Sequence, residues 1–271
     1  MSAAEAASRI GFVGLGDMGS LIAGHILKSG REVVGWDLRP EAVRAFAEVG
    51  GIAARDVTDV AFANVVISMV FDDRGARDLT LGSGGLAERL KPGSVHVMMA
   101  SLSPPLSTEL ANAHADHGQH YLAAPVFGRV EAAAAADLKV VCSGDEATFR
   151  RVAPILGVLG TVRWVGPNAY QSMLVKSVGN AMIYTAIETL REMFEVLSAG
   201  GVSQEAAREI LIDGLFPGQI FGGYAQMYMN HPDALHMTDL ARKDRRNCLA
   251  AADELRVAMP LIRYLHEQDL P

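Results

Sequence analysis

The sequence has few cysteines and no hydrophobic run long enough to cross a membrane. Only Cys142 and Cys248 occur among 271 residues, and they lie far apart along the chain. Two such cysteines indicate reduced, packed thiols rather than a disulfide framework, as is typical of a cytoplasmic protein. No apolar run approaches the ~20 residues of a membrane span. The first eight residues lack the basic and then apolar pattern of a signal peptide, which again favours the cytoplasm.

Positive charge and metal-ligand patterns are also scarce. The 24 Lys and Arg residues are outnumbered by 31 Asp and Glu residues, and the net charge is −7. Without a basic stripe, nucleic acid is not an expected partner, and neither is a membrane surface. His114, His117 and His120 recur every three residues, but we interpret them as a solvated helix end and expect no metal site. No Gly-x-Ser-x-Gly segment indicates a serine nucleophile.

The first part of the chain alternates between strand-like and helix-like segments. The near-continuous apolar run at 65–70 indicates a strand that is buried on both faces. Strands that alternate with helices predict a doubly wound parallel sheet, an α/β fold. The expected strands are 9–13, 32–36, 65–70, 94–99, 119–122, 139–142 and 162–165, and the main helices between them are 17–29, 39–48 and 104–117.

The pattern changes after residue 166. Residues 169–199 contain no proline and a single glycine, Gly179, and their apolar residues recur at helical spacing. One helix of this length spans about 45 Å, so we expect it to connect two domains or to cross into a partner subunit. Further helices are predicted at 203–213, 218–229 and 239–256, and no strand is predicted. We therefore divide the chain into an α/β domain at 1–166 and an all-helical domain at 167–271.

A glycine pattern at the start of the chain predicts a dinucleotide-binding loop of the Rossmann type. The apolar run 10–13 opens into Gly14-x-Gly16-x-x-Gly19, and Asp37 follows at the end of the second apolar run. The glycines allow a tight turn, approach of the backbone to a pyrophosphate and close packing of helix on strand. The amino terminus of the following helix offers N–H groups to the phosphates.

The acidic residue after the second strand bears on the choice of cofactor. A carboxylate at Asp37 accepts hydrogen bonds from ribose hydroxyls and repels a 2′-phosphate, which favours NAD(H). Arg39, two residues later, offers a guanidinium that would suit the 2′-phosphate of NADP(H). NAD(H) is the favoured cofactor, and NADP(H) stays open.

Two groups of polar residues in the later part are candidates for chemistry. Lys176 and Asn180 are four residues apart in the long predicted helix and share one face. An ammonium and a carboxamide beside a nicotinamide would suit proton transfer to a substrate oxygen, although a surface lysine over apolar neighbours has the same spacing. Lys243 and Asp244 lie in a charged stretch that suits either a solvated helix face or closure over a cofactor.

These motifs together resemble the β-hydroxyacid dehydrogenases, a group with 3-hydroxyisobutyrate dehydrogenases and glyoxylate or succinic semialdehyde reductases as members and imine reductases as relatives. The resemblance covers essentially the whole chain. It is carried by Gly14-Leu15-Gly16-Asp17-Met18-Gly19, Ser101-Leu102-Ser103-Pro104, Ala124-Pro125-Val126-Phe127-Gly128, Lys176-x-x-x-Asn180 and Lys243-Asp244.

The resemblance implies a Rossmann domain, a helical domain around a long interdomain helix, and a homodimer or larger homo-oligomer formed through the helical domain. It implies that Lys176 is the general acid/base and that Asn180 orients a small-molecule substrate. The residues implied for the cofactor are Gly14, Leu15, Gly16, Asp17, Met18, Gly19, Asp37, Leu38, Arg39, Met69, Val70, Ser101 and Lys243. Those implied for the substrate are Ser101, Phe127, Gly128, Arg129, Asn180 and Tyr224.

Three departures from the family pattern bear on the substrate. Phe127 and Arg129 replace a serine and a glycine of the family's substrate loop, and Gly179 replaces the first asparagine of its Lys-x-x-Asn-Asn motif. Arg129 suits a carboxylate, whereas Phe127 equally suits an apolar or imine substrate. We predict an NAD(P)-dependent enzyme that interconverts a small β-hydroxy acid and its aldehyde or ketone. The alternatives are an imine reductase and a non-catalytic nucleotide-binding protein, and the retained Lys176 argues against both.

Overall fold

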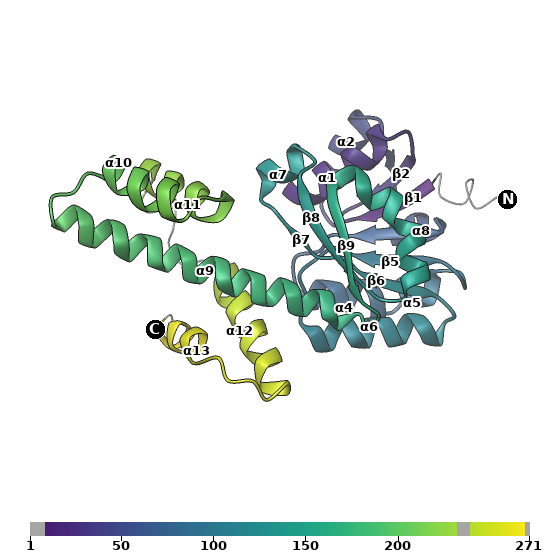
Figure 1. Cartoon of the computed structure of the whole chain (residues 1–271). Helices are drawn as coiled ribbons and strands as arrows, with labels where there is room; N and C mark the ends of the chain where they lie inside the picture. Colours follow the sequence, from purple (N-terminus) through teal and green to yellow (C-terminus); the bar gives the residue numbers. More distant parts are fainter. Residues whose placement is uncertain (1–8, 232–238, 269–271) are drawn as a thin grey trace. The chain divides into compact units, whose positions relative to one another are not determined.

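The protein consists of two compact units, which we call the N-terminal unit (Met1–Lys176) and the helical unit (Ser177–Pro271). The computed structural model describes residues 9–231 and 239–268 (Figure 1). The predicted lack of a signal peptide concerns residues 1–8, which lie outside the described residues. Within the described residues, no helix has the length and apolar character needed to cross a membrane.

The N-terminal unit is built on one sheet in the order β3-β2-β1-β4-β5-β6-β8-β7, and β9 pairs with β8. All pairs from β3 to β6 are parallel, whereas β8 is antiparallel to β6 and β7. Only residues 128–137 separate β7 from β8, too few for the crossover that a parallel pair needs. The strands are β1 (Arg9–Val13), β2 (Glu32–Trp36), β3 (Ile52–Ala53), β4 (Val65–Ser68), β5 (Val95–Met98), β6 (His120–Ala123), β7 (Val126–Phe127), β8 (Leu138–Ser143) and β9 (Gly160–Gly166).

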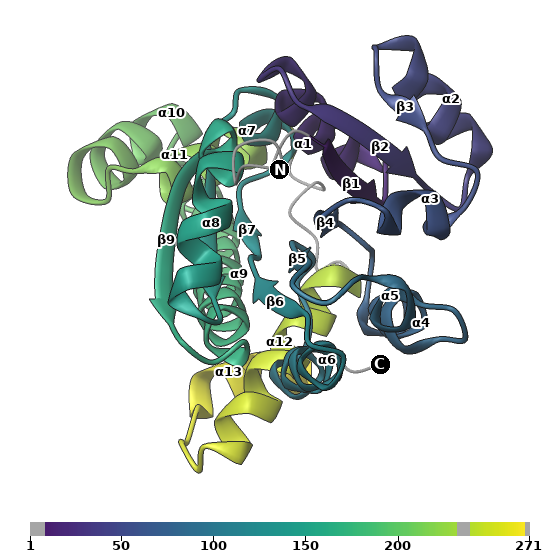
Figure 2. The same ribbon diagram turned by 90° about the vertical axis from the view of Figure 1, so that its right-hand side faces the viewer.

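Helices cover both faces of this sheet because successive strand residues enter different cores. Ile10 and Phe12 of β1 pack in the core that includes α1, whereas Val13 packs in the core that includes α3 and α5. Figure 2 shows α8 on one side of the strands and α5 and α6 on the other. The doubly wound fold is confirmed, with a sheet that is mostly parallel. The helices are α1 (Asp17–Lys28), α2 (Pro40–Glu48), α3 (Val57–Ala61), α4 (Asp73–Leu81), α5 (Leu86–Arg89), α6 (Pro104–Asp116), α7 (Val130–Ala134) and α8 (Glu146–Leu156).

The long helix α9 runs from Tyr170 to Ala199, as predicted. Its end is closed by two successive glycines. Gly201 has φ +80°, and the N–H of Val202 donates to the carbonyl oxygen of Leu197 at 2.9 Å, a glycine-based helix cap. The boundary between the two units falls inside α9, after Lys176. The sequence-based boundary at residue 166 is the end of β9, and the roles assigned there to the two domains stay predictions.

The described part of the helical unit contains helices only. Phe194 of α9 stacks on Tyr228 of α11 with ring centroids 4.9 Å apart, and Ile187 and Leu190 belong to the same core. The predicted helix at 203–213 is split, because its second part winds as a π-helix at Arg208–Leu215. The α-helices after α9 are α10 (Gln204–Ala207), α11 (Gln219–Asn230), α12 (Asp239–Glu254) and α13 (Pro260–Gln268).

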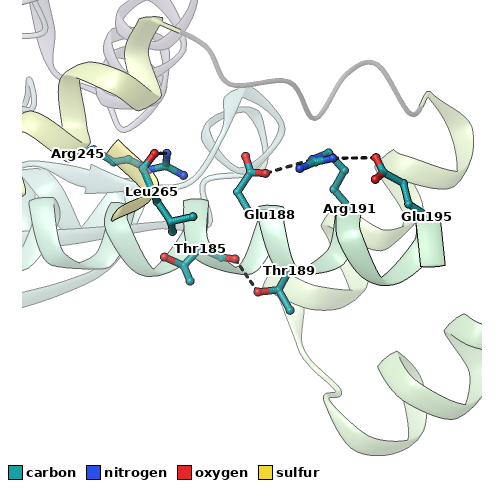
Figure 3. Close-up of polar contacts among 7 residues, drawn as sticks. All are labelled: Thr185, Glu188, Thr189, Arg191, Glu195, Arg245 and Leu265. Carbon is teal, nitrogen blue, oxygen red and sulfur yellow. Dashed lines mark hydrogen bonds and ion pairs between the residues drawn. The ribbon is translucent and has the colours of Figure 1, made fainter. Parts of the chain in front are cut away.

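Figure 3 shows arginine side chains of the helical unit in two different settings, and the Thr189 hydroxyl, which donates to the carbonyl oxygen of Thr185 at 2.9 Å within α9. Arg191 lies between Glu188 and Glu195 on α9, with N–O distances of 3.1 and 2.8 Å, in a setting that is partly exposed to solvent. Arg245 of α12 is instead fully buried, and its Nη1 donates to the carbonyl oxygen of Leu265 at 3.1 Å, which ties α12 to α13. Exposed pairs of the kind that Arg191 forms contribute little to stability.

A buried chain of side chains corrects the prediction of a solvated helix end for His114, whereas His117 and His120 are exposed as predicted. His114 is fully buried. Its Nε2 lies 2.9 Å from Nδ1 of His96, and its Nδ1 lies 2.6 Å from Oε1 of Gln119. The Nε2 of Gln119 donates to the carbonyl oxygens of Ala87 and Leu90, so its Oε1 must be the acceptor from His114. His114 fills the gap between α6 and β5 because a neutral imidazole can satisfy a partner on each nitrogen.

Both cysteine side chains are buried and unoxidised, as predicted. Cys142 lies on β8, and burial raises the pKa of its thiol to about 12. Burial also raises the pKa of the Cys248 thiol in α12. Neither thiol is therefore disposed to ionise or react near neutral pH.

Candidate functional site

The loop between β1 and α1 is shaped by close backbone packing. The N–H of Gly14 donates to the carbonyl oxygen of Trp36 at 2.9 Å, which fixes the loop to the end of β2. Gly14 has φ +91°, and a Cβ there would lie 2.2 Å from the carbonyl oxygen of Met69. A Cβ on Gly19 would lie 1.9 Å from the carbonyl oxygen of Gly14. Only glycine fits these two positions.

The amino terminus of α1 offers the geometry that a dinucleotide phosphate requires. Gly16 precedes the helix and provides no side-chain cap for the N–H groups of the first turn. A Cβ on Gly16 would have a single neighbour within 4 Å, the Nη2 of Arg39 at 3.6 Å, so the backbone is open to close approach there. Uncapped N–H groups and the helix dipole together bind anions. These residues fit a dinucleotide pyrophosphate.

Asp37 closes the same loop from the end of β2. Its Oδ2 accepts the N–H of Leu15 at 2.7 Å, and its Oδ1 accepts from the backbone N–H and the Nε of Arg39 at 2.9 and 3.1 Å. Partial burial opposes ionisation of this carboxyl group, but the hydrogen bonds from Arg39 and Leu15 outweigh it and lower the pKa of Asp37 below 3.8. The carboxylate is therefore ionised throughout the physiological range.

Several other residues predicted to bind the cofactor lie in the N-terminal unit at the carboxyl edge of the sheet, whereas Lys243 lies on α12 of the helical unit. Met69 and Val70 directly follow β4, and the N–H of Met69 donates to the carbonyl oxygen of Val13 at 2.8 Å. Ser101 follows β5 and is half-buried. Asp17 and Leu38 are exposed, Leu38 to 85%. In doubly wound sheets this edge is where nucleotides bind.

The predicted acid/base and the predicted substrate loop meet in the N-terminal unit. The Nζ of Lys176 lies 4.3 Å from the centroid of the Phe127 ring, over its face. Gly128, next to Phe127, has φ +132°. Arg129 is exposed, and its Nε lies 3.8 Å from a carboxylate oxygen of Glu131. The structure thus brings Lys176 and Phe127 together at the end of β7.

In the helical unit, Asn180 belongs to a buried cluster around Asp244. The Nδ2 of Asn180 donates to Oδ2 of Asp244 at 2.7 Å, and the hydroxyl of Tyr184 donates to the same oxygen at 3.3 Å. The Nζ of Lys243 lies 3.9 Å from Oδ1 of Asp244. Burial first, and then the charge of Asp244, raise the pKa of the Tyr184 hydroxyl above its ordinary 10.0. The orientation of the Asn180 amide is settled, because a carboxylate can only accept.

Tyr224, predicted to contact the substrate, lies on α11. It is partly buried and packs against the hydrophobic core that contains Ile187 and Phe194. Helix packing therefore accounts for part of its surface, and its role toward a substrate stays a prediction.

Residues 9–166 match the NAD-binding domain of 6-phosphogluconate dehydrogenase. The chain belongs to the 6-phosphogluconate and β-hydroxyacid dehydrogenase family. Its glycine loop and Asp37 are therefore parts of an NAD(P)-binding domain, and the chain shares the dehydrogenase class of this family.

Relatives of this chain within the family extend over nearly its whole length. It is 31% identical to the uncharacterized oxidoreductase YfjR of Bacillus subtilis, over 93% of this chain and 90% of that protein. It is 30% identical to 2-(hydroxymethyl)glutarate dehydrogenase of Eubacterium barkeri, over 95% of this chain and 86% of that protein.

Solved structures with the same fold include enzymes of two reaction types. A 3-hydroxyisobutyrate dehydrogenase from Salmonella typhimurium has a TM-score of 0.84 at 23% identity, covering 96% of this chain and 92% of that one. A Streptomyces aurantiacus imine reductase has a TM-score of 0.69 at 18% identity, covering 96% and 92%. At these identities the likeness shows the fold and leaves the choice between reactions to the site.

Two members of the polar cluster were not among the predicted site residues. Tyr184 continues the series of every fourth residue on α9 that begins at Lys176 and Asn180, so helical spacing was a usable signal for it. Asp244 was noted only as the neighbour of Lys243. Its contact with Asn180 joins positions 64 residues apart, and local spacing carries no signal for such a contact.

Proposed function

We propose that the protein interconverts a small β-hydroxy acid, or a similar alcohol, and the corresponding aldehyde or ketone, with Lys176 as the general acid/base. One observation carries this proposal. The ammonium of Lys176 lies over Phe127, inside the segment that the family resemblance assigns to the substrate. A proton donor next to the substrate loop suits reduction of a carbonyl group.

A nicotinamide cofactor held by the glycine loop and Asp37 would supply the hydride in the reductive direction. As the carbon–oxygen π bond breaks, its electron pair forms a new O–H bond with a proton from Nζ of Lys176. The lysine is left neutral and takes a proton from water before the next turnover. In the oxidative direction, neutral Lys176 removes the hydroxyl proton.

Asn180 is proposed to orient the substrate as a hydrogen-bond acceptor. Its Nδ2 is committed to Asp244, so its Oδ1 is the atom that faces away from this carboxylate. An amide oxygen accepts from an alcohol hydroxyl and thereby selects the position of that oxygen. Arg129 is proposed as the carboxylate clamp, because a guanidinium pairs with both oxygens of a carboxylate.

For the cofactor we propose a preference for NAD(H) over NADP(H). The ionised carboxylate of Asp37 would repel a 2′-phosphate, and Arg39 is already paired with it. Asp37→Asn keeps an acceptor for the N–H of Leu15 but removes the charge. It should therefore reduce the ratio of NADH to NADPH affinity, measured by fluorescence titration of both cofactors. A wild-type preference for NADPH would contradict this assignment.

Imine reduction is the second candidate. Phe127 and Gly179 favour it, because they replace polar side chains of the family pattern with an aromatic ring and a glycine. Lys176 favours carbonyl reduction, since its proton has a direct use at a carbonyl oxygen. The two candidates predict different substrates for the same cofactor.

We further propose that the protein is a cytoplasmic homodimer or larger homo-oligomer assembled through the helical unit. This unit exposes large apolar side chains, including Met182 at 68%, Val196 at 71% and Ile210 at 64%. Apolar surface of this kind is typical of an association surface. Light scattering on the purified protein should give the mass of a homo-oligomer, and Val196→Glu should lower this mass if the apolar surface mediates association.

The experiment that tests the proposed function is a turnover assay with NADH and NADPH. The substrates are small semialdehydes, α- and β-keto acids, and cyclic imines, and the variant is Lys176→Ala. We expect turnover of a carboxylate-bearing aldehyde or ketone, and a loss of at least ~100-fold in kcat in the variant, with cofactor affinity retained. A loss below ~10-fold would remove Lys176 from the acid/base role, and turnover of imines alone would select the second candidate.

A further inference from the structure

We propose that Phe127 is a positioning residue for Lys176, and that its ring face holds the ammonium in place as a proton donor. The observation is the 4.3 Å distance between Nζ of Lys176 and the ring centroid of Phe127. A cation within about 6 Å of a ring face is attracted by the quadrupole of the ring. The proposal rests on the proposed function, because it gives this contact a role in the same reaction.

The ring is presented by local backbone geometry. In β7, Val126 is buried, and successive strand residues face opposite sides, so Phe127 faces away from the core that Val126 enters. The strand is held by pairing with β8, where Phe127 lies opposite Lys139. Gly128 then turns the chain at φ +132°, with a Cβ position only 2.6 Å from the Leu138 side chain. The backbone that bears the Phe127 ring is therefore held in place by the sheet.

The lysine has an equally fixed origin at the start of α9. Ser172, one turn before Lys176, is buried and accepts a hydrogen bond from the Ser143 hydroxyl of β8 at 2.8 Å. The hydroxyl of Ser172 lies 3.3 Å from the carbonyl oxygen of Ala123 in β6. Met173 packs in the core beside Ala123. The same sheet thus anchors both the ring and the helix turn that bears the ammonium.

The contact with the ring restricts a lysine side chain that is otherwise flexible. Four methylene groups let Nζ sample a wide volume, and holding the side chain in one place costs rotamer entropy. The ring face offsets this cost and favours the charged form, which is the form that donates a proton in reduction. An aliphatic side chain of similar size would exclude water equally but would attract no charge.

Three substitutions separate these properties. Phe127→Tyr keeps an aromatic face, Phe127→Leu keeps bulk without it, and Phe62→Leu is the matched control at an exposed phenylalanine. We expect Phe127→Tyr to stay within about threefold of the wild-type kcat. Phe127→Leu should lose about tenfold, a loss that lies between the values for exposed and desolvated cation–π contacts. Phe62→Leu should leave kcat unchanged.

A graded series excludes a packing effect. Phenylalanine analogues with one, two and three ring fluorines at position 127 keep the shape of the ring but progressively weaken the negative potential of its face. We expect kcat to fall stepwise along the series with cofactor affinity unchanged. A flat series would overturn the proposal, and it would do so even if Phe127→Leu failed to fold.

A second readout needs neither cofactor nor turnover. The chain has five lysines (Lys28, Lys91, Lys139, Lys176 and Lys243), so a spectrum of lysine labelled with ¹³C at Cε is simple to assign with Lys176→Ala. Protons above a ring face shift upfield. The Hε signal of Lys176 should be upfield in the wild type and Phe62→Leu, and should rejoin the other lysines in Phe127→Leu. A wild-type signal among the other lysines would overturn the proposal.

The two proposals fail separately. If Lys176→Ala remains active, the proposed function fails. If Lys176→Ala is inactive but Phe127→Leu keeps full kcat, the acid/base role stands and the positioning role of Phe127 is overturned.

Discussion

The dinucleotide loop of the N-terminal unit and the Asp244 cluster of the helical unit hold their polar groups by different means. In the loop, backbone atoms hold backbone atoms, and the carbonyl oxygens of Gly14 and Met69 lie where Cβ atoms would otherwise be. In the cluster, the side chains of Asn180 and Tyr184 meet one carboxylate oxygen. The positions of Gly14 and Gly19 in the loop are therefore limited by space, with Asp37 adding a hydrogen bond to Leu15, whereas the cluster depends on charge and hydrogen bonding alone.

This difference predicts which substitutions each region tolerates. Adding even one methyl group at Gly14 or Gly19 of the loop should disrupt its backbone, because the new Cβ has no space. A cluster defined by hydrogen bonds should fail when one oxygen or charge is removed, even if the volume is kept.

The largest expected effect is that of Gly19→Ala. The new Cβ would lie 1.9 Å from the carbonyl oxygen of Gly14, so backbone must move. We expect a loss of about 3 kcal/mol in the free energy of unfolding, measured by urea denaturation, and a loss of detectable NADH binding. The matched control is Gly24→Ala in the same helix, where no atom lies within 4 Å of the added Cβ. It should stabilise the protein by about 0.5–1 kcal/mol, and equal effects of the two variants would break the comparison.

A smaller effect is expected for Asp244→Ala in the cluster. Removing the carboxylate leaves the Nδ2 of Asn180 without its acceptor, and we expect a loss of about 2 kcal/mol in the free energy of unfolding. Asp253→Ala on the same helix removes an exposed ion pair with Arg263 and should change stability by less than about 0.5 kcal/mol. If Asp244→Ala keeps wild-type stability and kcat, the cluster does not orient Asn180.

The pH dependence of stability tests a second hydrogen-bonded side-chain network, the buried histidines of the N-terminal unit. Burial, and then the neighbouring His114, lower the pKa of His96 in the N-terminal unit well below 6.5. The unfolded chain takes up a proton below pH 6.5 that the folded chain refuses, so stability falls as the pH is lowered through this value. The slope from this proton should rise below pH 6.5 toward a limit of about 1.4 kcal/mol per pH unit, seen in urea titrations down to pH 5.5. His96→Asn should make the slope shallower, and an unchanged slope would assign it to other groups.

The loop could be predicted from the sequence because spacing alone specifies it. Gly14, Gly16, Gly19 and Asp37 have positions set by one strand, one turn and one helix, and all of these are local. The strands and the long helix could be predicted for the same reason, because each shows its own periodicity in the local sequence. The strands β3 and β7 were not predicted, because two residues are too few to show a period.

Contacts between distant segments were the part that sequence could not supply. The histidines at 114–120 suggested a surface, but His114 finds partners on His96 and Gln119, and only the fold brings His96 close. The helix α8 contains Pro154, a residue that argues against a helix when it is considered alone. The π-helical turn at Arg208–Leu215 has the same apolar spacing as an ordinary helix, so its extra width was not visible.

The single glycine of α9 falls between two of the cores to which this helix contributes. Met173 is buried in a core of the N-terminal unit, and Ala181 is buried in a core of the helical unit. Gly179 lies between these anchors and weakens a helix by about 1 kcal/mol relative to alanine. Amide hydrogens near Gly179 should therefore exchange with solvent sooner than those near Phe194. The glycine lies just after the anchored turn that bears Lys176, and the helix passes from one unit to the other next to it.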